Sequence, residues 1–168
     1  PYKDSYMLPD TKKIEDYKTK YFDTPKKKIG ICWEAGATNL REQLHRTLNI
    51  ELFEDIINLE NASVYSFQVN PSLDKYKKYP HLIDLGSTFK SFDDTAGALK
   101  NLDTMITVDT SIAHLAGALG VKTYLILPYC ADWRWFGNDK TTEWYDSVTI
   151  FKQTHSNSWN NVFQEMLE

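Results

Sequence analysis

Apolar and polar positions along the chain fall into blocks that predict short buried strands separated by helices. The clearest block, residues 104–127, holds an apolar run, a polar turn at Asp109 and Thr110, an apolar helix and, at once, a second apolar run. Gly120 stands at the end of this helix, where a residue in the left-handed conformation is common. Strand, helix and strand in such close succession predict a βαβ unit with a right-handed crossover.

The same pattern predicts further elements on both sides of this unit. Strands are expected at residues 29–33, 63–68, 81–85 and 147–151, and helices at residues 10–22, 50–59, 91–102 and 159–167. Ser91 followed three residues later by Asp94 is typical of a capping box, which accounts for the acidic residues there without a metal. The alternation of strands and helices predicts an α/β fold, a Rossmann-like three-layer arrangement with a parallel sheet.

The first part of the chain differs from the rest. Residues 1–27 hold one expected helix followed by lysines, and we interpret them as an interdomain linker. Residues 28–168 are long enough to form one domain with a sizeable core. Because the chain begins with Pro1 rather than Met, we expect it to be a piece of a longer protein.

Composition narrows the class of protein. The net charge of −4 implies no general affinity for nucleic acid, and no apolar run approaches the length of a transmembrane segment. Cys32 in an expected strand and Cys130 in a loop do not resemble a disulfide framework, so a reduced, cytoplasmic setting is expected. No Asp-x-Asp motif and no Cys/His cluster occurs, so neither a metal site nor a cofactor is predicted.

The polar residues of the central unit gather where its first strand ends, at the edge where open α/β sheets bind ligands. Thr110 is a good helix N-cap. The backbone N–H groups of the next three residues, Ser111, Ile112 and Ala113, are then expected to be free and to form an anion site. Asp109 has the chemistry to accept hydrogen bonds from sugar or ribose hydroxyls.

His114 lies one turn into the same helix. Helical side chains lean back toward the N-terminus, so its imidazole would hang over the predicted anion site. A histidine that fills the core with its hydrogen bonds satisfied fits the same position. Spacing in the sequence does not decide between these two interpretations.

Two loops also carry candidate chemistry. The loop at residues 34–39, with Gly36, is small and polar and allows a ligand to approach the backbone, but it is neither GxGxxG nor a Walker A loop. Residues 132–135, which include Arg134, follow a strand-ending proline and predict an ordered rim at the ligand-bearing edge. An aromatic satellite core is the alternative for the two tryptophans of that segment.

Residues 108–120 match an Asp-Thr-x-x-x-His-Leu segment, and shorter matches occur at residues 83–86, 93–96, 127–128, 132–135, 144–145 and 150–153. On these residues the chain resembles the C-terminal half of GT-B glycosyltransferases of the ADP-heptose:lipopolysaccharide heptosyltransferase family. It is most similar to the heptosyltransferase-like domains of bacterial tetratricopeptide-repeat (TPR) proteins. The resemblance covers essentially the whole chain, and each short motif alone is weak.

The resemblance implies a half-site for a nucleotide-sugar donor. Asp109, Thr110 and the amides of Ser111 and Ile112 would hold the sugar and the diphosphate of the donor, with His114 close by.

The resemblance also concerns residues outside this segment. Arg46 matches a basic residue that faces the phosphates in the family, and Gln68 stands where relatives contact the nucleoside. Gly36 lies where this chain departs from the usual Gly-Asn-Pro of the repeat-protein branch. If Arg46 does not contact the diphosphate, Arg41 or Arg134 is the alternative contact.

The expected function is donor binding in an inverting, metal-independent glycosyltransferase. The general base is expected in a missing N-terminal domain, so catalytic residues stay unassigned and the chain alone is expected to be inactive in transfer. Its partners would be a nucleotide-diphosphate sugar and either that domain or TPR repeats, with base, sugar and acceptor unspecified. Two alternatives remain: a non-catalytic scaffold, which the departure near Gly36 favours, and a nicotinamide-dependent oxidoreductase, which the missing GxGxxG disfavours.

Overall fold

A single sheet of six strands organises the structure, a computed structural model that describes residues 5–36, 46–69, 78–135, 140–155 and 159–167. In spatial order the strands are β3 (Ile83–Asp84), β2 (Ala62–Ser66), β1 (Lys27–Cys32), β4 (Thr104–Val108), β5 (Thr123–Leu127) and β6 (Val148–Lys152). Every neighbouring pair is parallel. The strand order turns back between β1 and β4, the kind of position where open α/β sheets bind ligands.

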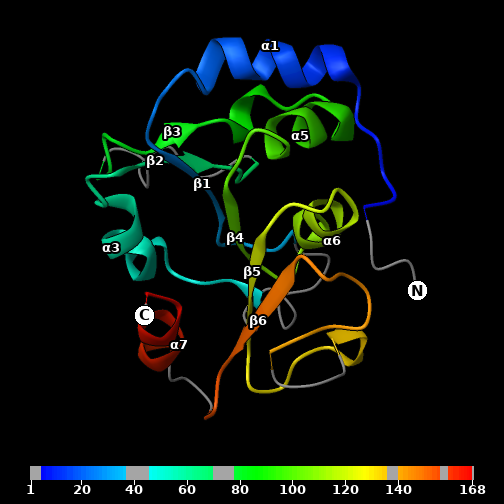
Figure 1. Ribbon diagram of the computed structural model, residues 1–168. Coiled ribbons are helices and arrows are strands. Elements are labelled where there is room, and N and C mark those ends of the chain that lie inside the picture. The colour runs from blue at the N-terminus through cyan, green and yellow to red at the C-terminus, as the bar shows by residue number, and fades with distance from the viewer. Residues whose placement is uncertain (1–4, 37–45, 70–77, 136–139, 156–158, 168) are drawn as a thin grey trace.

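Helices cover both faces of this sheet (Figure 1). The helices are α1 (Thr11–Tyr21), α3 (Glu54–Ile57), α5 (Phe92–Leu99), α6 (Ser111–Ala118) and α7 (Asn160–Leu167), and the 3-10 turns are η1 (Ile50–Phe53), η2 (Gly86–Thr88) and η3 (Trp133–Trp135). One apolar core lies between the strands and η1, α3 and α7, and a second lies between the strands and α1, α5 and α6. The prediction of a three-layer, Rossmann-like α/β fold is therefore confirmed.

Residues at the ends of the helices explain where the helices begin and end. Asp10 caps α1 by accepting a hydrogen bond from the Lys12 amide at 2.8 Å. The capping box of Ser91 and Asp94 at the start of α5 is present, and Gly120 after α6 has a φ of 69°. The capping box and the left-handed Gly120 were predicted and are confirmed, because each depends on residues at the helix end itself, whereas the Asp10 cap was not predicted.

Two expected elements are shorter than predicted. The helix expected at residues 50–59 is the 3-10 turn η1 followed by the four-residue helix α3. The strand expected at residues 81–85 is reduced to the two residues of β3. β3 lies at the edge of the sheet and pairs on one side only, with Tyr65 and Ser66 of β2.

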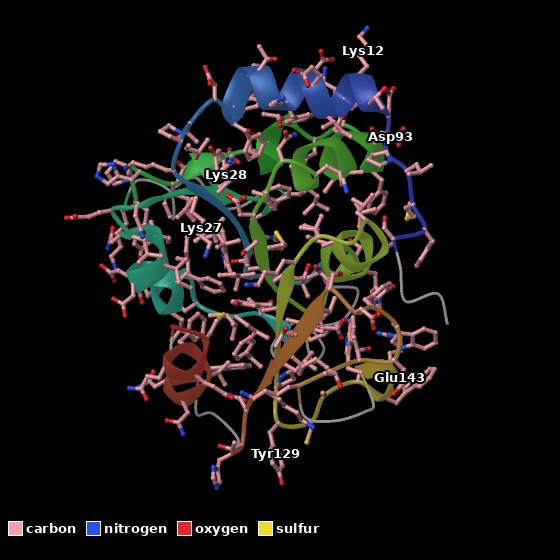
Figure 2. The ribbon with its side chains drawn as sticks, in the orientation of Figure 1. Lys12, Lys27, Lys28, Asp93, Tyr129 and Glu143 are labelled. Carbon is pink, nitrogen blue, oxygen red and sulfur yellow. The ribbon has the colours of Figure 1, made fainter. Side chains whose placement is uncertain are left out.

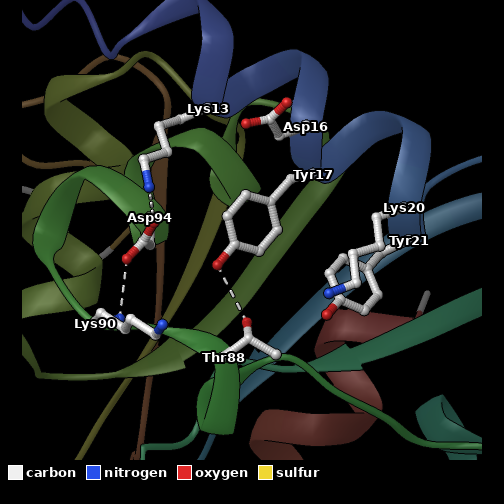
Figure 3. Close-up of a pocket in the computed structure, with 8 residues that line it drawn as sticks. All are labelled: Lys13, Asp16, Tyr17, Lys20, Tyr21, Thr88, Lys90 and Asp94. Atoms are coloured by element: carbon white, nitrogen blue, oxygen red, sulfur yellow. Dashed lines mark hydrogen bonds and ion pairs between the residues drawn. The ribbon is translucent and has the colours of Figure 1, made fainter.

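Helix α1 packs on α5 as an outer layer, and a groove of about 420 Å³ lies between α1 and the segment from η2 to α5 (Figure 3). Lys13 Nζ lies 2.6 Å from Asp94 Oδ1, and the hydroxyls of Tyr17 and Thr88 are 3.1 Å apart. The hydrogen bond from Lys13 is the main cause that lowers the pKa of Asp94. These contacts attach α1 to the segment from η2 to α5. They also provide partners for polar groups that line the groove.

Polar side chains such as Lys12 point outward from the layers (Figure 2). Among the helices in the described part of the chain, none has the length and apolar character needed to span a bilayer. Tyr129, which is exposed, lies just beyond the carboxyl end of β5, at the edge of the sheet where the candidate site is found.

Candidate functional site

A cavity of about 400 Å³ opens where β1 and β4 end. It is lined by Ala35, Gly36, Arg46, Asp109, Thr110, Ser111, His114 and Arg134. Seven of these eight residues were expected at the site from the sequence, and Ala35 was not. They come from the segments that follow β1, β4 and β5, which the parallel sheet brings to a single edge.

The start of α6 forms one wall of the cavity. Thr110 Oγ1 accepts a hydrogen bond from the Ile112 amide at 3.2 Å, and the Thr110 carbonyl accepts one from the Ala113 amide at 3.1 Å. Thr110 is thus the predicted N-cap, but two of the three amides expected to be free are already bonded to it. Within the described residues, the Ser111 amide makes no hydrogen bond and remains available at the helix N-terminus.

The Thr110 hydroxyl is itself held by the strand below it. It lies 3.4 Å from the hydroxyl of the fully buried Thr107, whose own hydroxyl donates to the Val108 carbonyl at 2.9 Å. This second contact fixes the rotamer of the cap. It also fixes the direction of the first turn of α6 relative to β4.

Asp109 is a buried carboxylate that forms an ion pair with Arg46. Its side chain is 4% exposed, and its Oδ2 lies 3.7 Å from Nη1 of Arg46, whose side chain is 24% exposed. A buried charge requires a partner, and Arg46 supplies it. Arg134 lines the same cavity, and its Nη2 lies 3.2 Å from Oδ2 of Asp132. The cavity wall therefore carries two guanidinium groups and one carboxylate, together with the positive end of the α6 dipole.

His114 contributes its ring to the cavity wall. Its Nδ1 lies 3.1 Å from the hydroxyl of Tyr145, and its ring stacks on Trp135 with centroids 4.7 Å apart and planes 19° apart. Burial lowers the pKa of His114, and the nearby Asp109 partly opposes that effect. The lowered pKa favours the neutral imidazole at pH 7.

Gln68 lies outside the cavity lining and serves the loop beside it. Its Oε1 accepts a hydrogen bond from the Glu34 amide at 2.9 Å, and its Nε2 donates to the Glu34 carbonyl at 3.3 Å. The side-chain amide thus holds the chain immediately before Ala35 and Gly36. The contact of Gln68 with a nucleoside stays a prediction.

Cys32 lies beneath this part of the site. Its thiol is buried 3.4 Å from Oε1 of Gln68, and burial raises its pKa to about 12. A thiol that stays protonated is a poor nucleophile.

The segment at residues 132–135 is divided between a rim and a small core. Arg134 faces the cavity, and its carbonyl accepts a hydrogen bond from the Trp144 indole at 2.6 Å. Trp135 is buried against His114, whereas Trp133 is 73% exposed. Both interpretations given for this segment therefore apply, each to different residues.

Tyr145 was not predicted as a site residue. It is 31 positions from His114 and sits in the segment before β6, and no local motif marks it as the partner of that histidine. A metal site is also not evident: among the described residues, no three His, Cys, Asp or Glu side chains are grouped to hold an ion.

The same fold occurs in solved glycosyltransferase structures. ADP-heptose lps heptosyltransferase II of E. coli aligns with a TM-score of 0.63 and 11% identity, over 96% of this chain and 54% of its own. A glycosyl transferase family 9 protein of Veillonella parvula DSM 2008 aligns with a TM-score of 0.57 and 12% identity, over 91% of this chain and 43% of its own. KpsC of Thermosulfurimonas dismutans, a beta Kdo 2,4 transferase, aligns with a TM-score of 0.53 and 13% identity, over 90% and 51%.

At these identities the similarity shows the fold, which is that of GT-B glycosyltransferase domains. The chain spans about half the length of these proteins. No protein-family model and no curated protein sequence matches it.

Proposed function

We propose that this chain is the donor-binding domain of an inverting, metal-independent glycosyltransferase and that its cavity holds a nucleotide-diphosphate sugar. The observation that carries the proposal is the convergence of Arg46, Arg134 and the N-terminus of α6 on one cavity that also contains Asp109. Guanidinium groups and helix amides are the groups that bind phosphates most readily in proteins.

Each group has a distinct role in this proposal. Arg46, Arg134 and the Ser111 amide stabilise the charge on the departing diphosphate, which a metal ion would otherwise neutralise. Preorganised electrostatic groups of this kind are typically the largest contribution to catalysis. The buried carboxylate of Asp109 accepts hydrogen bonds from donor hydroxyls and keeps Arg46 directed into the cavity.

The remaining parts of the reaction lie outside this chain in our proposal. The general base that activates the acceptor is supplied by a further domain, for which residues 1–27 are the connection, and TPR repeats are a candidate neighbour. A heptosyltransferase-like donor is the preferred class. We also place the protein in the cytoplasm, because Cys32 and Cys130 are both unpaired thiols.

Calorimetric titration with ADP, UDP, GDP and their sugar conjugates, with and without EDTA, tests the proposal. We expect at least one diphosphate to bind with an affinity that EDTA leaves unchanged, and the matching nucleoside to bind far more weakly. Binding that the chelator abolishes would contradict metal independence. The absence of binding to every diphosphate would favour a scaffold that retains only the fold.

A further inference from the structure

Tyr145 lies directly across helix α6, over a glycine. A Cβ placed on Gly117 would lie 2.5 Å from Cγ of the Tyr145 ring, so only glycine permits this approach. Gly117 is three positions after His114, which places both residues on the same face of α6. The ring therefore covers Gly117 while its hydroxyl reaches His114 Nδ1 at 3.1 Å.

The His114 ring is held from two further directions. Trp135 stacks on one of its faces at 4.7 Å, and the Tyr145 ring meets it edge-on at 5.9 Å with planes 66° apart. With the ring plane and Nδ1 both fixed, Nε2 is the nitrogen directed away from Tyr145. His114 lines the cavity, and among the described residues only Nδ1 of its two ring nitrogens makes a hydrogen bond, which leaves Nε2 for a ligand.

The N-terminal segment lies against the end of α6. The backbone amides of Tyr6 and Met7 donate to the Ala118 carbonyl at 3.1 and 3.2 Å. Burial raises the pKa of Tyr145, so its hydroxyl stays protonated at neutral pH.

We propose that Tyr145 is a positioning residue that donates its hydroxyl proton to Nδ1 of His114 and thereby holds the imidazole as the Nε2–H tautomer, with that N–H directed at the diphosphate. The inference rests on the proposed function of the cavity. A neutral imidazole that accepts at Nδ1 carries its proton on Nε2.

This arrangement has a chemical consequence for ligand selection. The cavity gains a neutral donor at a fixed position, in addition to the charges of Arg46 and Arg134. A neutral N–H donor binds an anionic oxygen in preference to an N–H group or a metal-bound group. Because the donor is neutral, it adds no further charge to the site. A donor diphosphate offers such an oxygen, and a nucleoside without phosphates lacks it.

Nitrogen-15 spectra of histidine-labelled, ligand-free protein test the tautomer directly, with the His114 signals assigned by their loss in His114→Gln. At pH 7.5 we expect one protonated ring nitrogen at Nε2 and an unprotonated Nδ1. An Nδ1–H pattern or rapid averaging of the two tautomers would overturn the proposal. The measurement needs neither a ligand nor a variant of Tyr145.

Tyr145→Phe then tests the consequence for binding, because it keeps the ring over Gly117 and removes only the hydroxyl. We expect a mixture of His114 tautomers and an affinity for the bound diphosphate about threefold to tenfold weaker, the scale of one neutral hydrogen bond. Tyr124→Phe is the matched control, since Tyr124 packs against Phe151 away from the cavity. Unchanged affinity in Tyr145→Phe would refute the positioning role.

The two proposals fail in different ways. Wild-type protein that binds no diphosphate would refute the proposed function, and the spectra would still decide the arrangement of Tyr145 and His114. Wild-type protein that binds a diphosphate but shows the Nδ1–H tautomer would keep the function and refute the role given to Tyr145.

Discussion

Arg46 and Asp109 form an ion pair across the candidate cavity, with Nη1 of the arginine 3.7 Å from Oδ2 of the carboxylate. One residue follows β1 and the other follows β4, two strands that are neighbours in the sheet. The carboxylate is buried and the guanidinium is partly exposed, so the arginine side of the ion pair is accessible to a ligand. A diphosphate that enters the cavity would compete with Asp109 for this arginine.

Replacing Arg46 should therefore separate phosphate binding from nucleoside binding. Arg46→Ala is expected to weaken a nucleoside diphosphate by about 1.5–3 kcal/mol, the range for a hydrogen bond to a charged group. The corresponding nucleoside should lose much less, as titration calorimetry of both ligands would measure. Lys78→Ala, which removes an equal charge from an exposed ion pair with Glu51, is the control. Equal losses for nucleoside and diphosphate would move the phosphate contact to Arg134, which lines the cavity, or to Arg41, which lies outside the described residues.

The N-cap of α6 should contribute to stability whether or not a ligand binds. Thr110→Ala removes the hydroxyl that accepts from the Ile112 amide, and we expect the free energy of unfolding to fall by about 1 kcal/mol. Thr110→Ser keeps the oxygen and should recover most of this loss. Urea unfolding of the two variants makes the comparison, and equal stabilities would show that the cap contributes little.

Protonation of His114 should oppose folding. Its ordinary pKa is 6.5, and burial lowers that pKa in the folded protein, where Asp109 and Asp132 favour the charged form and Arg134 disfavours it. The unfolded chain thus binds the proton first as the pH falls. The contribution of His114 to stability is complete above its ordinary pKa and is lost between that value and the lower pKa of the folded state.

Urea unfolding between pH 5 and pH 8 measures this dependence of stability on pH. His114→Leu should reduce the fall in stability on acidification relative to wild type, and the other histidines cancel in the comparison. Ligand affinity should also stay level from pH 7 upward, since the imidazole is already neutral there. An affinity that falls as the pH rises from 7 to 8 would show that a cationic His114 binds the ligand.

Gly117 should not tolerate a side chain, although alanine is the better helix former. A methyl group there would press into the Tyr145 ring, and we expect Gly117→Ala to reduce the free energy of unfolding by about 1–3 kcal/mol through overpacking. Gly36→Ala is the control for stability, because no described atom lies within 4 Å of a Cβ at that position. A Gly117→Ala variant as stable as wild type would mean that the Tyr145 ring shifts freely.

Local chemistry made much of the fold predictable. The N-cap of α6, the capping box of α5 and the left-handed Gly120 all depend on residues near the helix ends, and each was predicted. The strands β1, β2, β4, β5 and β6 follow apolar runs buried between two helical layers. The short edge strand β3 was overestimated, because its length depends on pairing with only one neighbour.

The sequence by itself determined the α/β fold class and the group of polar residues after β4. The apolar runs and the polar turn that follows β4 each lie within a short segment of the chain, so local patterns show them. Only the tertiary structure decided that Arg46 reaches Asp109, that Gln68 holds the Glu34 backbone, and that Tyr145 lies over Gly117 and contacts His114. These contacts join residues far apart in the chain. They depend on strand order and on the close approach of packed side chains, which no periodicity within a short segment encodes.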